Sequence, residues 1–264
     1  EILASAGVGN DGGTVGFSVT EKNFMGRGIG LISSLSLSEE KVKGEFTVNN
    51  PNFNYTEKSL STSFFAINTD KMADSGYDSS EIGFSFGSKF EQYDNLFFNP
   101  FFKTVAEKLE TNSLASASIK KQEGNYFTST IGYAFDYDVR NQKFRTTDGF
   151  RNIYAINIPV ISETNTLTNS LNYKVFKELF ENNITSASFI IKSANSLTND
   201  DIKLSERLFV PSRRLRGFEN GKIGPKDGAD YIGGNYMATL NISTTLPQIL
   251  PNAQNTDFLL FVDV

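Results

Sequence analysis

The sequence predicts an all-β fold, an antiparallel up-and-down barrel of about thirteen amphipathic strands. Three observations predict it. Apolar and polar residues alternate with a period of two along most of the 264 residues, the pattern of half-buried strands. The chain has 24 Phe, 10 Tyr and 21 Gly but only 7 Pro, a composition that favours strands over helices. No crossover helix or domain linker interrupts the series, which argues against an α/β fold.

Short turns rich in Gly, Asn and Asp separate the predicted strands. Residues 71–80 are predicted to form an exposed loop and residues 107–123 a loop, with a short helix as the alternative. Residues 199–231 are the one long loop, and loops of that length are usually functional or disordered. The strands are placed at residues 1–10, 14–24, 29–38, 42–49, 60–69, 82–87, 96–106, 127–138, 150–160, 166–178, 183–195, 234–246 and 255–264.

The length of the strands and their polar faces indicate a membrane barrel. Alternation alone also allows a soluble barrel or sandwich, because it does not tell the inside from the outside. Most predicted strands reach ten residues or more, which matches the length that crosses a bilayer at a tilt. Their polar faces carry Ser, Thr, Asn, Glu and Lys, which would be buried unpaired in a narrow soluble core but would line a watery lumen. We therefore predict a transmembrane barrel.

The composition excludes several functions. The chain has no Cys and no His, which removes disulfides, imidazole catalysis and nearly all ordinary zinc or iron sites. A net charge of −5 argues against nucleic acid as a partner. We expect no enzymatic activity, no cofactor and no bound metal. Oxygen ligands at residues 199–201 allow a Ca²⁺ site, but a solvated loop is the preferred interpretation.

An odd number of strands predicts that the barrel is incomplete. Antiparallel closure and the even counts of single-chain bacterial barrels both require another strand. The last predicted strand also runs to the final residue, Val264, without a turn. We expect residues 1–264 to be one barrel domain that lacks its C-terminal part, with about 13 of 16 strands present.

Several motifs in order along the chain resemble the BamA family of outer-membrane assembly barrels, which is related to mitochondrial sorting and two-partner secretion barrels. The resemblance covers nearly the whole chain. Its most specific motif is Leu215-Arg216-Gly217-Phe218, near the tip of the long loop. A solvated basic loop is the simpler interpretation of the loop's composition alone. The other matching segments are 21–28, 49–53, 147–149, 223–225 and 233–235.

The resemblance implies a role for each residue of this motif. In the family the long loop folds into the lumen, and its Arg meets acidic residues on the following strands. Here that implies an ion pair between Arg216 and Asp263, a backbone turn at Gly217 and packing of Phe218 against the wall. The family's second acid falls near Ser243, which cannot supply a carboxylate.

The first strand, residues 1–10, is built mostly from small residues. Two glycines weaken the pairing of a strand, so the seam between this strand and the one that closes the barrel should open easily. An opened seam exposes unpaired backbone groups that another strand can pair with. The alternative is that the glycines only relieve crowding in a curved sheet. The residues of this candidate gate are Ile2, Ala4, Ala6, Gly7 and Gly9.

The resemblance implies that the protein inserts nascent β-barrel proteins through this lateral gate in the outer membrane of a Gram-negative bacterium. The implied partners are client barrels, accessory lipoproteins and a bilayer whose outer leaflet is lipopolysaccharide. It also implies periplasmic POTRA domains that this chain lacks. The alternative function is a substrate-specific secretion channel or a passive pore of the same superfamily.

Overall fold

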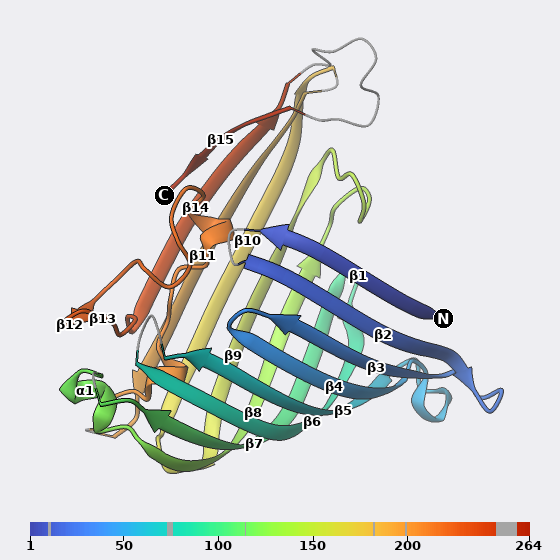
Figure 1. Cartoon of the computed structure of the whole chain (residues 1–264). Helices are drawn as coiled ribbons and strands as arrows, with labels where there is room; N and C mark the ends of the chain where they lie inside the picture. The colour runs from blue at the N-terminus through green and yellow to red at the C-terminus, as the bar shows by residue number, and fades with distance from the viewer. Residues whose placement is uncertain (10–11, 73–75, 114, 182, 199, 247–257) are drawn as a thin grey trace.

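Thirteen antiparallel strands form one sheet in the computed structural model, which describes all residues except 10–11, 73–75, 114, 182, 199 and 247–257. Each strand pairs with its neighbour in the sequence, apart from the inserted hairpin of β12 and β13 (Figure 1). The sheet consists of β1 (Ile2–Gly9), β2 (Gly12–Phe24), β3 (Ile29–Ser38), β4 (Lys41–Asn50), β5 (Ser59–Lys71), β6 (Tyr77–Tyr93), β7 (Leu96–Thr111), β8 (Gly124–Asp138), β9 (Gly149–Ser162), β10 (Thr166–Phe180), β11 (Asn183–Ser196), β14 (Tyr236–Thr245) and β15 (Leu259–Asp263).

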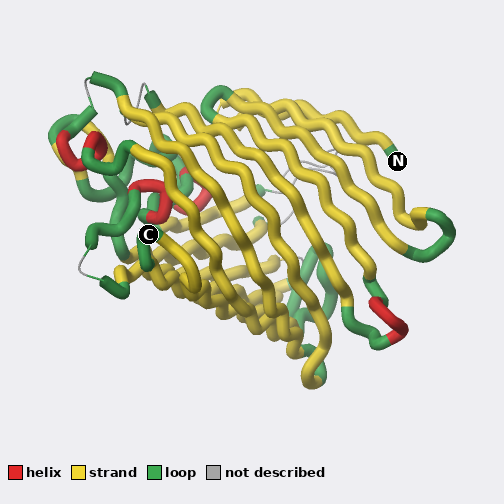
Figure 2. Tube along the Cα trace, turned by 90° about the horizontal axis from the view of Figure 1, so that it is seen from below, coloured by secondary structure: helices red, strands yellow, loops and turns green. Residues whose placement is uncertain are grey.

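The sheet curves around an inner space (Figure 2). The predicted all-β barrel architecture and its thirteen strands are confirmed. Within the described residues, β1 pairs only with β2 and β15 pairs only with β14, so these two are the edge strands of the sheet. No helix among the described residues combines the length and the apolar character that would let it cross a membrane.

The outer face of the sheet is apolar. The register places Phe64 of β5 opposite Phe84 of β6, and Phe102 of β7 is a diagonal neighbour of Phe84, with ring centroids 6.2 and 5.8 Å apart. Large apolar side chains on this face remain exposed, among them Ile82 and Phe127. The inner face carries polar and charged residues. This is the reverse of a soluble protein, and it explains why the alternation in the sequence is so regular.

Two sequence predictions about loops are wrong. The predicted loop at residues 71–80 ends early, because β6 already begins at Tyr77. In the predicted loop at residues 107–123, the residues up to Thr111 belong to β7, and the alternative of a short helix is found as α1 (Ala117–Lys120). Both errors have one cause. Beyond the apolar band the outward positions become polar as well, so the strands continue without an alternation that can be seen in the sequence.

The most buried apolar cluster lies where the long loop meets the ends of the middle strands. Leu109 of β7, Ile119 of α1 and Leu204 of the long loop are each 1% exposed and pack with Tyr77 and Ala115. Three segments far apart in the sequence therefore share a core at this end of the sheet.

Glycines on the inner face make room for aromatic side chains. A Cβ at Gly132 of β8 would lie 2.3 Å from Cζ of Phe101 and 2.8 Å from the carbonyl oxygen of Ile156. The neighbouring backbone cannot move aside without disturbing the pairing of β8 with β9. Gly44 of β4 differs, since a Cβ there would meet nothing within 4 Å.

We predict that Gly132→Ala destabilises the folded sheet by about 1–3 kcal/mol, the usual cost of overpacking a filled site. Gly44→Ala should be neutral or slightly stabilising, because alanine loses less backbone entropy on folding than glycine. Urea unfolding of the two variants of the intact protein in detergent, followed by cold-gel mobility, measures both. Equal unfolding midpoints would contradict the prediction.

Candidate functional site

The long loop between β11 and β14 lies on the inner side of the sheet (Figures 1 and 2). Backbone hydrogen bonds in both directions between Leu208 and Gly234, of 2.8 and 2.9 Å, join its two arms. Between these arms the loop forms the turn η3 (Ser212–Arg214) and then the hairpin of β12 (Lys226–Asp227) and β13 (Asp230–Tyr231). The earlier turn η2 (Leu204–Glu206) lies before the junction.

Arg216 and Asp263 are brought together on the inner face. Arg216 donates from Nε to Oδ2 of Asp263 and from Nη2 to Oδ1, both over 2.7 Å, and its backbone N–H donates to Oδ2 over 3.1 Å. This two-point fork is the strong geometry of an arginine–carboxylate pair. The Asp263 side chain is only 4% exposed, so the pair is shielded from solvent on the acid's side.

The surroundings of Arg216 fix its orientation. Its guanidinium lies 3.5 Å from the ring centroid of Phe261, which is two residues before Asp263 on the same face of β15. The hydrogen bonds that Arg216 donates to Asp263 raise the pKa of Arg216 above its ordinary value. Gly217 has a φ of +91°, a conformation that favours glycine. The expected backbone turn therefore occurs directly after the paired arginine.

Asn241 of β14 completes the site and was not predicted. It stands opposite Asp263 in the register, and its Nδ2 donates to Oδ1 of Asp263 over 2.8 Å and to the carbonyl oxygen of Arg214 over 2.7 Å. Ser243, where a second acid was sought, instead lies 3.0 Å from the hydroxyl of Ser186. Asn241 lies two residues before Ser243 on the same face, so counting by two along the strand would have found it.

Arg214 provides a second cationic contact, with neutral partners. Its Nη1 donates to the hydroxyl of Ser188 over 3.1 Å and to Oδ1 of Asn241 over 3.4 Å. Burial lowers the pKa of Arg214 below its ordinary value. Asn241 therefore connects both arginines of the motif region with Asp263, and the three strands β11, β14 and β15 share one polar network with the loop.

Phe218 does not pack against the wall as predicted. Its side chain is 55% exposed, whereas Leu215 at the other end of the motif is half-buried. Gly217, with its φ of +91°, turns the chain directly after Arg216, and Phe218 follows this turn. The motif thus contacts the sheet through Arg216, while its aromatic residue stays largely exposed.

The hairpin beyond the motif is attached to α1. The backbone N–H of Ser116 donates to Asp230 over 2.8 Å, and the hydroxyl of Ser118 donates to Asp227 over 2.5 Å. These bonds from Ser118 lower the pKa of Asp227. The predicted alternative of a Ca²⁺ site at residues 199–201 includes Asn199, which lies outside the described residues.

Among the described residues, β1 has a neighbouring strand, β2, on one of its two sides. Glu1 and Thr20 exchange two backbone hydrogen bonds of 2.8 Å, and such pairs alternate along an antiparallel ladder. The N–H and C=O groups of Ile2, Ala4 and Ala6 therefore point away from β2. The same register places their side chains on the outer face, opposite Val19, Phe17 and Val15.

The two glycines of the first strand lie within the β1–β2 ladder. Gly7 pairs with Thr14 and Gly9 with Gly12. A Cβ at Gly7 would meet nothing within 4 Å, so relief of crowding does not account for glycine at that position. The remaining physical effect of Gly7 is on the strand itself, because glycine weakens strand pairing.

The sequence and the fold have clear relatives. The family model described as the Omp85 superfamily domain matches residues 23–264. BamA from Haemophilus ducreyi lacking POTRA domains 1–3 has a similar structure, with a TM-score of 0.86, 18% sequence identity and 99% of this chain covered. CdiB from Acinetobacter baumannii is similar with a TM-score of 0.57, 12% identity and 99% coverage.

The chain spans 56% of the BamA structure and 48% of the CdiB structure that it matches, about half of each. No curated protein matches the chain by sequence. At these identities the two likenesses concern the fold.

We predict that Arg216→Ala exposes the loop tip and Arg213→Ala does not. Loss of Arg216 leaves Asp263 nearly buried without its counter-ion, at a cost of about 1–3 kcal/mol. Arg213 is exposed, so its removal should stay within about 0.5 kcal/mol of the parent. Chymotrypsin, which cleaves after Leu215 and Phe218, should cut the Arg216→Ala protein at least about tenfold faster. Equal cleavage of both variants would contradict the anchoring of the loop by Arg216.

Proposed function

The chain belongs to the Omp85 superfamily, and on that basis we propose that it inserts and folds nascent β-barrel proteins through a lateral gate at β1. The observation that carries the proposal is the make-up of β1, whose backbone groups at Ile2, Ala4 and Ala6 point away from β2 beside small side chains. The similarity of the whole sheet to BamA supports the same function.

The outer face supports a location in the outer membrane of a Gram-negative bacterium. An exposed apolar face is unfavourable in water but is the surface that a bilayer solvates. Inside a bilayer an unpaired strand edge costs several kcal/mol per backbone group, because no water replaces the missing partner. When the neighbour of β1 leaves, a client strand would lower the free energy by pairing with the backbone groups that become exposed.

Small side chains make the exchange of partners at β1 easy. Ala4 and Ala6 bury little apolar area against whichever strand lies beside them, so few side-chain contacts must be broken when that strand leaves. Gly7 adds backbone freedom. A neighbouring strand bearing Val or Phe at these positions would hold its partner more tightly. We propose that this weakness is what allows the gate to open and release a finished client.

The long loop, which Arg216 anchors, also supports the proposed function. Arg216 fixes the loop tip to β14 and β15, at the opposite edge of the sheet from β1. We propose that this contact keeps β14 and β15 in register while β1 exchanges partners. Accessory lipoproteins and lipopolysaccharide remain proposed partners, and we propose no enzymatic activity.

A secretion channel is the second candidate function. The sheet is similar to that of CdiB as well, and the inner face is polar enough to line a path for an extended polypeptide. The two functions differ in the part of the sheet that the client contacts. Insertion requires contact at the edge of β1, whereas secretion requires contact with inner-face side chains.

We predict that a photo-crosslinking amino acid at Ala4 captures nascent barrel proteins during assembly in cells. The same probe at Phe64, on the outer face in the middle of the sheet, should capture none, because that strand has both neighbours. A third probe replaces Ser36, which is exposed on β3 and faces inward.

Capture at Ser36 with none at Ala4 would favour secretion and contradict insertion through β1. Absence of any captured protein at all three positions would favour a passive pore. Each probe-bearing protein should first show the same cold-gel mobility as the parent, so that capture is compared between folded sheets.

A further inference from the structure

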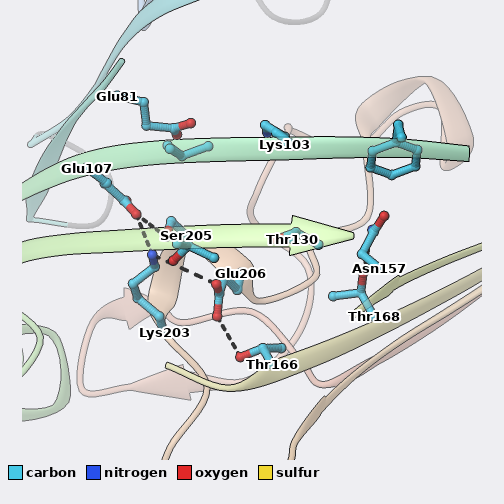
Figure 3. Close-up of a pocket in the computed structure, with 13 residues that line it drawn as sticks. Glu81, Lys103, Glu107, Thr130, Asn157, Thr166, Thr168, Lys203, Ser205 and Glu206 are labelled. Carbon is cyan, nitrogen blue, oxygen red and sulfur yellow. Dashed lines mark hydrogen bonds and ion pairs between the residues drawn. The ribbon is translucent and has the colours of Figure 1, made fainter. Parts of the chain in front are cut away.

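Lys203 is a buried cation in the long loop, far from the Arg216 motif. Its Nζ lies 2.6 Å from Oε2 of Glu107 on β7, and the two side chains are each 4% exposed (Figure 3). The hydroxyl of Ser205 donates to the same oxygen over 3.1 Å. An ammonium group is rarely buried this deeply unless it is paired, so the contact defines where this part of the loop must lie.

The ammonium group of Lys203 offsets an unfavourable position of the Glu107 carboxylate. It stands directly opposite Glu81 on β6, and like charges in such a cross-strand position repel one another. Both acids line a cavity of about 430 Å³ on the inner face. When the loop is docked, Lys203 compensates the charge of Glu107. If the loop left, two carboxylates would face each other on neighbouring strands.

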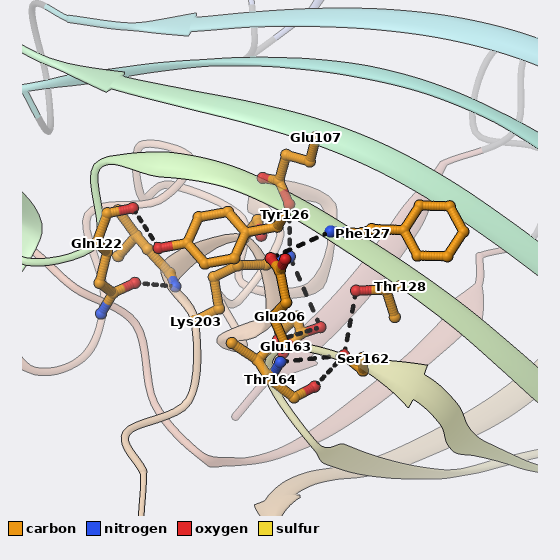
Figure 4. Close-up of polar contacts among 12 residues, drawn as sticks. Glu107, Gln122, Tyr126, Phe127, Thr128, Ser162, Glu163, Thr164, Lys203 and Glu206 are labelled. Carbon is orange, nitrogen blue, oxygen red and sulfur yellow. Dashed lines mark hydrogen bonds and ion pairs between the residues drawn. The ribbon is translucent and has the colours of Figure 1, made fainter.

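Further contacts of the same short segment reach two more strands. Nζ of Lys203 lies 4.8 Å from the ring centroid of Tyr126 on β8 (Figure 4). Glu206, 3.9 Å from Lys203, accepts a hydrogen bond of 2.6 Å from the hydroxyl of Thr166 on β10. Burial raises the pKa of Glu206, although Lys203 and this hydroxyl favour its charged form.

The backbone of the segment is held as well. The N–H of Leu204 donates to Oε1 of Gln122, and the hydroxyl of Tyr126 donates to the carbonyl oxygen of Gln122 over 2.6 Å. Leu204 is 1% exposed in the apolar cluster with Leu109 and Ile119. Figure 4 shows Lys203, Tyr126 and Gln122 in one connected group.

We propose that Lys203 is a second, independent anchor, which positions the root of the long loop, residues 202–208, on β7, β8 and β10. The contacts of Lys203 and those of Arg216 described above have no residue in common, and they lie on different strands. Interactions at separate sites without shared partners contribute additively, so either anchor should hold when the other is broken. The loop thus connects the middle strands of the sheet with β14 and β15.

This inference rests on the proposed function and deepens it by naming the residue that positions the root of the long loop, and its test does not require insertion activity. Hydrogen exchange of the intact protein in detergent is followed by mass spectrometry on peptides covering the root and the tip, residues 212–228. Lys203→Met should raise hydrogen exchange of the root at least about tenfold, because it leaves the carboxylate of Glu107 without its cation. Arg216→Ala should raise exchange of the tip and leave the root within about threefold of the parent.

A second variant separates the ion pair from simple packing. Replacing a buried pair as a unit by apolar residues is often neutral, whereas removal of one partner is costly. Lys203→Met with Glu107→Leu should therefore return root exchange to within about threefold of the parent. Lys108→Met is the control, since it removes an ion pair with Glu110 in which both side chains are 56% exposed. It should change nothing.

Two outcomes would overturn the proposal. One is root exchange in Lys203→Met that equals the parent. The other is a double variant that is worse than Lys203→Met alone, since the effects would then come from lost packing. Glu107→Gln, which nearly preserves side-chain size, replaces Lys203→Met if that variant does not fold. Client insertion is measured separately, so a failure of the insertion hypothesis would leave the exchange result unaffected.

Discussion

The inverted polarity of the sheet is the constraint on which the rest of the structure depends. Because the large apolar side chains lie mostly on the outer face, the inner face carries many polar ones, and the buried apolar cluster around Leu109 lies at one end of the sheet. Specific polar contacts therefore hold the long loop on the inner face. The loop places two cations, Lys203 and Arg216, against two acids, Glu107 and Asp263, whose side chains are each 4% exposed with the loop in place.

The two anchors differ in the chemistry that suits their surroundings. Arg216 uses a planar fork and a ring contact, which fix its orientation as well as its distance from Asp263. Lys203 is a compact charge in a smaller site, where one short contact and a buried leucine neighbour define its place. An arginine at position 203 or a lysine at position 216 would therefore not be equivalent, although the charge would be unchanged.

The sequence was sufficient to predict the strands, because their apolar and polar residues alternate regularly. Thirteen strands followed from the alternation, and the meeting of Arg216 with Asp263 followed from family resemblance. What could not be predicted depends on non-periodic packing. The position of α1 and the root contact of Lys203 are set by tertiary contacts between distant segments, and the exposure of Phe218 follows the local turn at Gly217. Asn241 was missed because the search was for an acid, whereas the second partner of Asp263 had to be a donor.

That replacement of an acid by Asn241 changes what the site does. Two carboxylates around one arginine would compete for its donors and leave a net negative charge. Here Asn241 donates to Asp263 and to the loop backbone, so the carboxylate is surrounded by donors and the loop is fixed by a neutral residue as well as by charge. Asn241 lies on β14 and Asp263 on β15, so the loop tip can be held only while these two strands are paired in register. The anchor therefore reports on the pairing of the strands at that edge of the sheet, and a shift of β15 by one residue would turn Asp263 to the outer face and release it.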